Sequence, residues 1–186
     1  MDIDNNMAGL DFGAYNRIMV VGNNGSGKSY FSDKLSFAIG LPVIHLDTLF
    51  WRPGWLMPSE DEWREINAGL VCGKKWIIEG NVNHGGTMEM RYNAADLIIF
   101  LDINDFVCFI SVFKRRSKRA GWPTFLVEKI DVGFINLLKG LLRYNKTRRK
   151  TLMLLRAKYP DKPFLVIKSR KKINKLLKQE NVGVYR

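Results

Sequence analysis

The residues whose types and spacing point most directly to chemistry lie between positions 17 and 29, where the sequence reads Arg-Ile-Met-Val-Val-Gly-Asn-Asn-Gly-Ser-Gly-Lys-Ser. A glycine, four further residues and then Gly-Lys-Ser form the phosphate-binding P-loop pattern. In this pattern backbone N–H groups surround phosphate oxygens, the lysine reaches the outer phosphates and the hydroxyl binds Mg²⁺. The candidate residues for binding ATP and Mg²⁺ are Gly22, Asn23, Asn24, Gly25, Ser26, Gly27, Lys28 and Ser29.

The segments on both sides of this pattern predict the strand and the helix that a P-loop requires. Residues 18–21 are an apolar run typical of a buried strand. After the pattern, Phe31, Leu35 and Ala38 recur at helical spacing until Gly40-Leu41-Pro42, a glycine cap followed by a proline stop. The helix therefore directs its positive end toward the phosphate site, which an ordinary glycine turn would not do.

Acidic residues follow two other apolar runs. Residues 43–46 end at Asp47, and residues 76–78 end at Glu79. In an open α/β sheet, ligands bind at the carboxyl ends of the strands, so both carboxylates are expected near the phosphate site. Asp47 is then a candidate for orienting an acceptor, and Glu79 for holding Mg²⁺ or its bound water.

Five short apolar runs separated by helical patterns predict an α/β fold with a parallel sheet and right-handed crossovers. The last two runs are residues 97–101, followed by Asp102, which resembles a Walker B acid, and residues 164–167. The Ser59-Glu60-Asp61-Glu62 sequence is a capping box and predicts a helix over about 60–71. A length of 186 residues fits a single domain.

An aromatic segment at residues 48–58 follows Asp47 and is expected to be irregular. Trp51 and Trp55 could stack on a planar substrate while Arg52 binds an acceptor phosphate, or the two rings could simply anchor the segment to the protein body. The residue types leave both interpretations open. His84, in a glycine-containing segment, is expected to be solvated rather than a ligand.

The net charge of +12 indicates an anionic partner. Nucleotide phosphates, a nucleic-acid backbone and a solvated basic face all fit this charge, but no helix-turn-helix or zinc finger appears, so nucleic acid is the secondary expectation. No apolar run approaches the roughly 20 residues of a membrane span, and residues 1–6 do not have the pattern of a signal peptide. Cys72 and Cys108 match no metal or redox spacing. A cytoplasmic protein with free thiols is expected.

Together these stretches resemble the adenylate-kinase-like P-loop family of DNA topology modulation proteins. The stretches that carry the resemblance are residues 22–29, 41–47, Trp51 with 53–55, 76–81, Arg91 with 95–96, and 101–102. The resemblance covers about residues 17–180. It implies a five-stranded parallel core in the order 2-3-1-4-5, bound ATP and Mg²⁺, an acceptor-binding segment at about 47–75 and a lid at about 115–150.

The resemblance also assigns roles to single residues. Asp47 would lie in the acceptor pocket, and Glu79 occupies the place where the family usually has Asp. Arg91 matches an arginine expected to bind acceptor phosphate, and Arg115 a lid-base arginine that would neutralise the transferred phosphate. Ser111 stands where relatives tend to carry another basic residue.

The leading hypothesis is an ATP-dependent phosphotransferase acting on a nucleotide or nucleoside. Lys28, Mg²⁺ on Ser29, and Arg115 or Arg119 would offset the charge on the moving phosphoryl group. Asp47 would orient an acceptor hydroxyl, whereas a phosphate acceptor would depend more on Arg91 and Arg52. The alternatives are a nucleic-acid-binding regulator and a P-loop ATPase or nucleotide sensor without an acceptor. The oligomeric state has no signature in the sequence.

Overall fold

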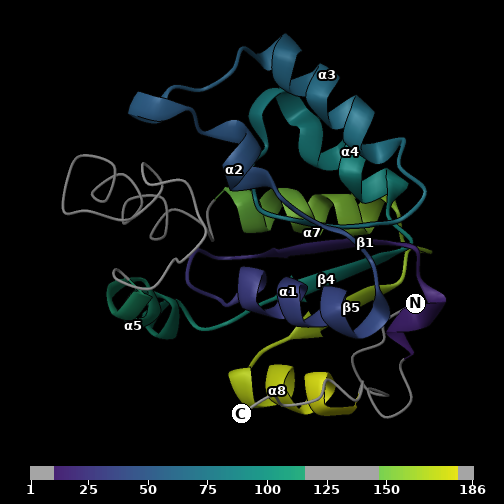
Figure 1. The fold of residues 1–186 in the computed structure, drawn as a ribbon, viewed down its shortest axis with the longest axis vertical. Coiled ribbons are helices and arrows are strands. Elements are labelled where there is room, and N and C mark those ends of the chain that lie inside the picture. The colour runs from purple at the N-terminus through teal and green to yellow at the C-terminus, as the bar shows by residue number, and fades with distance from the viewer. Residues whose placement is uncertain (1–10, 116–146, 180–186) are drawn as a thin grey trace.

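The computed structural model describes residues 11–115 and 147–179, which form a parallel sheet with helices on both faces (Figure 1). Its strands are β1 (Arg17–Gly22), β2 (Val43–His45), β3 (Trp76–Glu79), β4 (Leu97–Leu101) and β5 (Phe164–Ile167). The strand order is β2-β3-β1-β4-β5, and every neighbouring pair is parallel. The predicted fold class and strand order are confirmed.

The helices of the described residues are α1 (Lys28–Ile39), α2 (Leu46–Phe50), α3 (Glu60–Val71), α4 (Thr87–Ala94), α5 (Asp105–Arg115), α7 (Arg148–Lys158) and α8 (Arg170–Gln179). Short 3-10 turns are η1 (Phe12–Ala14), η2 (Pro53–Trp55) and η3 (His84–Gly86). The predicted helix ends are present. The Ser59 hydroxyl accepts from the Glu62 N–H at 3.2 Å to start α3, and Gly40 ends α1 in the left-handed conformation at φ 69°.

Two apolar cores hold the helices against opposite faces of the sheet. Successive side chains of a strand point to opposite faces. Ile18 and Val20 therefore pack with α1, α5 and α8, whereas Met19 and Val21 pack with α2, α3, α4 and α7. Figure 1 shows α1 and α8 on one side of the sheet and α3, α4 and α7 on the other. This sandwich fixes the loops that leave the carboxyl ends of the strands.

Three parts of the chain are more ordered than the sequence pattern indicates. Residues 46–50 form α2, so Asp47 lies in the first turn of a short helix rather than at the end of a strand, and the segment expected to be irregular begins with helix. Residues 87–94 form α4, for which no prediction was made, because its apolar spacing is weak and a buried arginine, Arg91, lies inside it. Phe12, in a stretch with few apolar residues, is buried beside Phe31, with 6.3 Å between the ring centroids.

The lid expected at 115–150 falls mostly on residues 116–146, which lie outside the described residues together with Arg119. Arg115 is the last residue of α5. Within the described ranges, no helix is long and apolar enough to cross a membrane.

Candidate active site

The candidate residues meet where three neighbouring strands end. β1 ends at Gly22 and runs into the P-loop, while β3 ends at Glu79 and β2 at His45, the two paired in register. Because β3 lies between β1 and β2, the Glu79 side chain is placed between the P-loop and the start of α2. The sheet therefore brings together residues that are far apart in the sequence.

The P-loop backbone takes a course that only glycine allows at its centre. Gly25 has φ 81°, and a Cβ there would lie 2.2 Å from the backbone oxygen of Cys108 in α5. Gly27 has φ 97° and directly precedes the first residue of α1. The left-handed region favours glycine, and a contact that short cannot exist. The glycine at position 25 is therefore required because the P-loop backbone lies close to α5.

Side chains from outside the loop bind its first two residues. Asn81, just after β3, accepts from the Gly22 N–H at 3.1 Å, and its amide donates to the Gly22 carbonyl. The Asn23 amide donates to Asp105 at 2.8 Å, at the start of α5. The two Asn81 bonds occupy both backbone groups of Gly22, the first P-loop glycine, so the loop is anchored before any ligand binds.

A second anchor comes from α8, which packs on the same face of the sheet as α1 and α5. The Arg170 guanidinium, at the start of α8, donates to the Gly25 carbonyl at 3.0 Å and to the Ser111 hydroxyl. Ser111 is the position where the resemblance leads one to expect a basic residue, and here a cation reaches the same place from another helix. Asn81 and Arg170 were missed because their P-loop contacts join segments that are distant in the sequence.

Lys28 is largely buried, and its ammonium group donates to the Asn23 carbonyl at 3.1 Å. The hydroxyl of Ser26 is also buried and has no hydrogen-bond partner in the structure. A buried polar group without a partner is costly unless a ligand or water satisfies it. This orphaned hydroxyl, inside a loop of the phosphate-binding pattern, fits an anion bound by the loop.

Glu79 forms the polar centre of the site and is only 2% exposed. Its Oε1 accepts from the Ser29 hydroxyl at 3.0 Å and from His45 Nδ1 at 2.9 Å, whereas its Oε2 is buried without a partner. Burial by itself would raise the pKa of Glu79, but the hydrogen bond from His45 and the charge of Lys28 lower it below its usual value. Glu79 is therefore an anion with one unsatisfied oxygen beside a hydroxyl.

The Ser29 hydroxyl and Glu79 Oε2 fit Mg²⁺, which prefers hard oxygen ligands and keeps several waters or phosphates in its shell. No group of three or more His, Cys, Asp or Glu side chains in the described residues could hold a metal ion by itself. A magnesium ion shared between Ser29, Glu79 and nucleotide phosphates needs no such group. The chemistry of the donors therefore agrees with the predicted metal residues.

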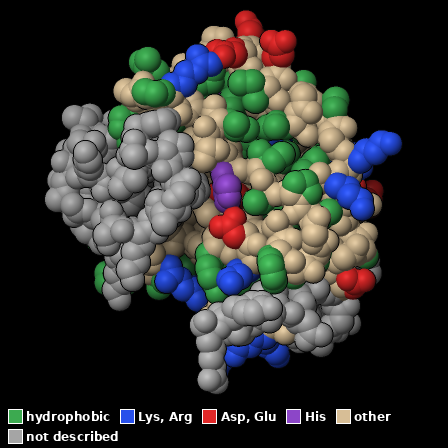
Figure 2. Space-filling model, viewed as in Figure 1, with side chains coloured by type: hydrophobic (Ala, Val, Ile, Leu, Met, Phe, Trp, Pro, Cys, Tyr) green, Lys and Arg blue, Asp and Glu red, His purple; other side chains and the backbone are tan. Residues whose placement is uncertain are grey.

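His45 is another residue of the site for which no role was predicted. Its Nδ1 donates to Glu79 at 2.9 Å and its Nε2 to Asp33 of α1 at 3.1 Å. Its hydrogen bonds with Asp33 and Glu79 raise the pKa of His45 from 6.5 to about 9, so the ring is charged at neutral pH. Figure 2 shows a histidine and an acidic side chain at the surface near the middle of one face. The available signal was the position of His45 at a strand end, two residues before Asp47.

The raised pKa of His45 predicts that the protein loses stability in mild alkali. Because the folded pKa lies above the unfolded one, the stabilisation is complete below pH 6.5 and disappears as the pH rises through about 9. At about 1.4 kcal/mol per pKa unit, the loss is at most about 3–4 kcal/mol. Urea unfolding between pH 6 and 9.5 should show this decrease in the wild type. A His45→Asn protein should show a flatter profile, and an equal slope in the two proteins would contradict the assignment.

The residues predicted to bind an acceptor include Asp47, which lies in α2, and the aromatic residues of the segment that follows it. Trp51 contacts Phe50 and Trp55 edge to face, at centroid distances of 4.9 and 5.5 Å. Arg52, also predicted to bind acceptor, is exposed and pairs with Glu62 of α3. The aromatic cluster is thus attached to the protein through Phe50, while the Arg52 charge is shared with an acidic neighbour.

Arg91 lies in the protein interior, and most of its hydrogen-bond donors are used there. It is completely buried, and its guanidinium donates to Asn67 of α3, to the Val82 carbonyl and, at 3.1 Å, to the Thr87 hydroxyl. Burial lowers the pKa of Arg91 from 12.5 to about 9. The sequence shows the residue type but not its burial. In this arrangement Arg91 joins α3, α4 and the segment after β3. These bonds do not favour the predicted binding of acceptor phosphate by Arg91, which stays a prediction.

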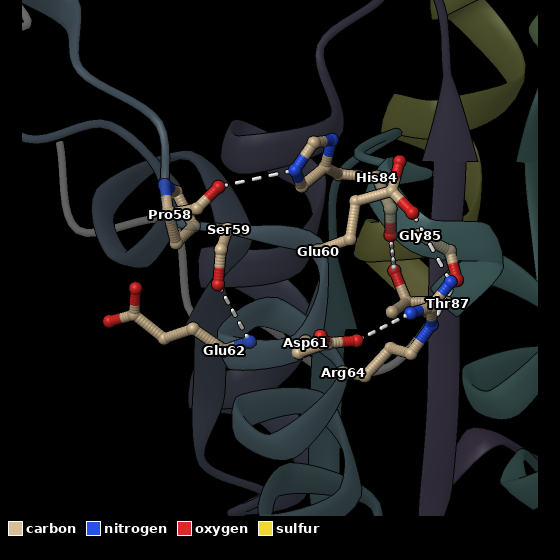
Figure 3. Close-up of polar contacts among 9 residues, drawn as sticks. All are labelled: Pro58, Ser59, Glu60, Asp61, Glu62, Arg64, His84, Gly85 and Thr87. Carbon is tan, nitrogen blue, oxygen red and sulfur yellow. Dashed lines mark hydrogen bonds and ion pairs between the residues drawn. The ribbon is translucent and has the colours of Figure 1, made fainter.

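Figure 3 shows the junction between the start of α3 and η3, beside the aromatic segment. His84 Nε2 donates to the Pro58 carbonyl at 3.1 Å, and Arg64 donates to the Gly85 carbonyl at 3.0 Å. Arg64 also pairs with Glu60 and Asp61. His84 is therefore part of the scaffold rather than a solvated side chain.

Asp102 follows β4 in the place of a Walker B acid, but in this structure it pairs with a basic side chain. Its carboxylate accepts from Arg149 of α7 at 3.1 and 3.3 Å. Glu79, not Asp102, is the carboxylate that contacts the P-loop hydroxyl of Ser29.

No protein-family model and no curated protein match the sequence. Solved structures with the same fold include shikimate kinase from Acinetobacter baumannii in complex with shikimate, at TM-score 0.56 and 13% identity, covering 94% of this chain and 98% of that one. Shikimate kinase from Bacteroides thetaiotaomicron aligns at TM-score 0.52 and 15% identity over 89% of this chain and 96% of that one. A gluconokinase from Sinorhizobium meliloti 1021 aligns at TM-score 0.50 and 14% identity, covering 89% of each chain. The chain thus has a P-loop kinase-like fold, and the resemblance to DNA topology modulation proteins gains no support.

Proposed function

We propose that this protein transfers the γ-phosphoryl group of ATP to a small acceptor. The observation that carries the proposal is the arrangement around Glu79. Its Oε1 is bound to the P-loop hydroxyl of Ser29, its Oε2 is buried without a partner, and Lys28 lies close enough to lower its pKa. A P-loop that only stabilised the fold would have no need for an unsatisfied buried carboxylate oxygen beside its hydroxyl.

The proposed roles follow from these positions. Residues 22–29 would bind the phosphates of ATP, and Ser29 with Glu79 would hold Mg²⁺. When bound, the metal ion would neutralise charge on the phosphate oxygens. Lys28 would release the Asn23 carbonyl and donate to the outer phosphates. Arg115 and Arg119 are proposed to add positive charge to the transferred group.

The acceptor is proposed to be a hydroxyl compound, and of the two expected classes a nucleoside fits better than a nucleotide. The two arginines expected to bind an acceptor phosphate are engaged elsewhere, Arg91 in the interior and Arg52 with Glu62. Asp47 would orient the acceptor hydroxyl and take its proton while that oxygen forms a bond to the γ-phosphorus. The bond from phosphorus to the bridging oxygen breaks, and ADP leaves. Trp51 and Trp55 are proposed to contact a planar ring of the acceptor.

The test is ³¹P NMR of ATP and Mg²⁺ incubated with the wild type and with Lys28→Ala, against nucleosides and their monophosphates. We expect ADP together with a phosphorylated nucleoside from the wild type, and neither from the variant. ADP with only inorganic phosphate would instead indicate an ATPase or nucleotide sensor. Phosphorylation of the monophosphates alone would contradict the hydroxyl acceptor but not the transfer.

A second candidate, nucleic-acid binding of the kind suggested by the DNA topology modulation proteins, is favoured by the net charge of +12. On α8, however, the lysines are exposed while Ile173, Leu176 and Leu177 are buried, as on any solvated amphipathic helix. Duplex binding that falls steeply with salt and does not depend on Lys28 would favour this candidate. The absence of Lys28-dependent turnover would contradict the proposed transfer.

A further inference from the structure

A chain of four side chains begins at Asp33 of α1, passes through His45 and Glu79, and returns to the P-loop hydroxyl of Ser29 at the start of the same helix. Asp33 contacts His45 Nε2 at 3.1 Å, His45 Nδ1 contacts Glu79 Oε1 at 2.9 Å, and Ser29 donates to the same Oε1 at 3.0 Å. Because carboxylate oxygens only accept hydrogen bonds, both ring nitrogens of His45 donate. The imidazole ring is therefore held at both ends in one orientation.

The consequence for Glu79 is a fixed carboxylate plane. A carboxylate can turn about its terminal torsion, whose energy wells are broad. Two donors converge on Oε1, so this oxygen is held in place and Oε2 remains as the free ligand atom, buried without a partner. If Mg²⁺ binding draws the Ser29 hydroxyl away from Glu79, His45 is the donor that still holds Oε1.

The location of the chain argues against a purely packing role. Asp33 is exposed and His45 is partly exposed, and neither belongs to the two apolar cores. His84, the other histidine of the sequence, shows the contrasting case, because its ring contacts Phe50 at 5.6 Å and its Nε2 donates to the Pro58 carbonyl. The two histidines therefore differ in their contacts, although both lie near α2.

We infer that His45, held by Asp33, is a positioning residue that presents Glu79 Oε2 to the metal ion of the ATP complex. The inference rests on the proposed function, because it assumes that Glu79 holds Mg²⁺. Hydrogen-bond partners behind a metal ligand typically contribute 10- to 100-fold to metal affinity. His45 would act without touching the metal or the nucleotide.

The experiment measures Mn²⁺ binding by EPR in the presence of a non-hydrolysable ATP analogue, so that no turnover is needed. In His45→Ala we expect the apparent dissociation constant of Mn²⁺ to rise about 10- to 100-fold. Asp33→Asn, at an exposed position, should give a smaller rise in the same direction. His45→Asn, whose amide can replace Nδ1, should recover part of the affinity. His84→Ala is the matched control and should bind Mn²⁺ as the wild type does.

Glu79→Gln distinguishes a failure of the inference about His45 from a failure of the proposed metal role of Glu79. If Glu79→Gln weakens Mn²⁺ binding but His45→Ala does not, the inference about His45 is wrong and the proposed function is untouched. If Glu79→Gln also leaves Mn²⁺ binding unchanged, the metal role of Glu79 in the proposed function is wrong as well. An equal loss in His45→Ala and His84→Ala, with lower melting temperatures in both, would mean a merely structural role and would overturn the inference.

Discussion

A Gly25→Ala protein is expected to bind ATP about 10- to 100-fold more weakly than the wild type. The added Cβ would lie 2.2 Å from the backbone oxygen of Cys108, and φ at this position is 81°. Backbone strain of this kind costs about 1–3 kcal/mol, and about 1.4 kcal/mol corresponds to a tenfold change in affinity. The loop can escape only by moving away from α5, which displaces the N–H groups that would contact phosphate.

The control for this substitution is Gly40→Ala. Gly40 also has a left-handed φ, 69°, but a Cβ there would meet nothing within 4 Å, and it ends α1 at the far side from the P-loop. We expect Gly40→Ala to lose about 1 kcal/mol of stability and to keep its ATP affinity. Isothermal titration calorimetry with ATP and Mg²⁺ gives the comparison. Equal ATP affinities in Gly25→Ala and the wild type would show that the loop does not need this conformation.

The sheet could be predicted from the sequence because its signals are local. Each strand is a short apolar run, and Gly40 and Ser59 mark helix ends by local chemistry that the structure reproduces. The helices α2 and α4 were not predicted, because both are short and have little apolar periodicity. Their stability comes from tertiary packing, for example Phe50 of α2 against Trp63 of α3 at a centroid distance of 4.9 Å.

The candidate site also contains residues that local patterns predict and residues whose contacts are distant in the sequence. Residues 22–29 form a contiguous pattern, so their loop could be recognised in the sequence. Glu79 could be predicted to lie near this loop because ligands bind at the carboxyl ends of the strands in an open α/β sheet. His45 and Asn81 contact Glu79 and Gly22 across neighbouring strands. The resemblance implied which strands are neighbours, but not which side chains at their ends form hydrogen bonds. Residue type also says little about burial.

Arg91 is the clearest case in which the residue type does not show that a side chain is buried. We expect Arg91→Ala to lower the free energy of unfolding by about 3–5 kcal/mol. Its removal would leave the Asn67 and Val82 oxygens buried without their donor, at about 1–3 kcal/mol each. It would also open a cavity at a completely buried position. At roughly 2–4 °C per kcal/mol for a chain of this size, the melting temperature should fall by about 10 °C.

Arg64→Ala provides the comparison, because Arg64 is an exposed arginine of the same region whose partners, Glu60 and Asp61, are also exposed (Figure 3). Exposed pairs contribute about 0–1 kcal/mol, so Arg64→Ala should unfold at nearly the wild-type urea concentration. If Arg91 bound acceptor phosphate instead, Arg91→Ala would keep its stability and raise the KM for a phosphorylated acceptor. A stability loss below about 1 kcal/mol together with such a rise in KM would therefore return Arg91 to the acceptor site. A large stability loss shared with Asn67→Ala would establish it as the buried link between α3 and α4.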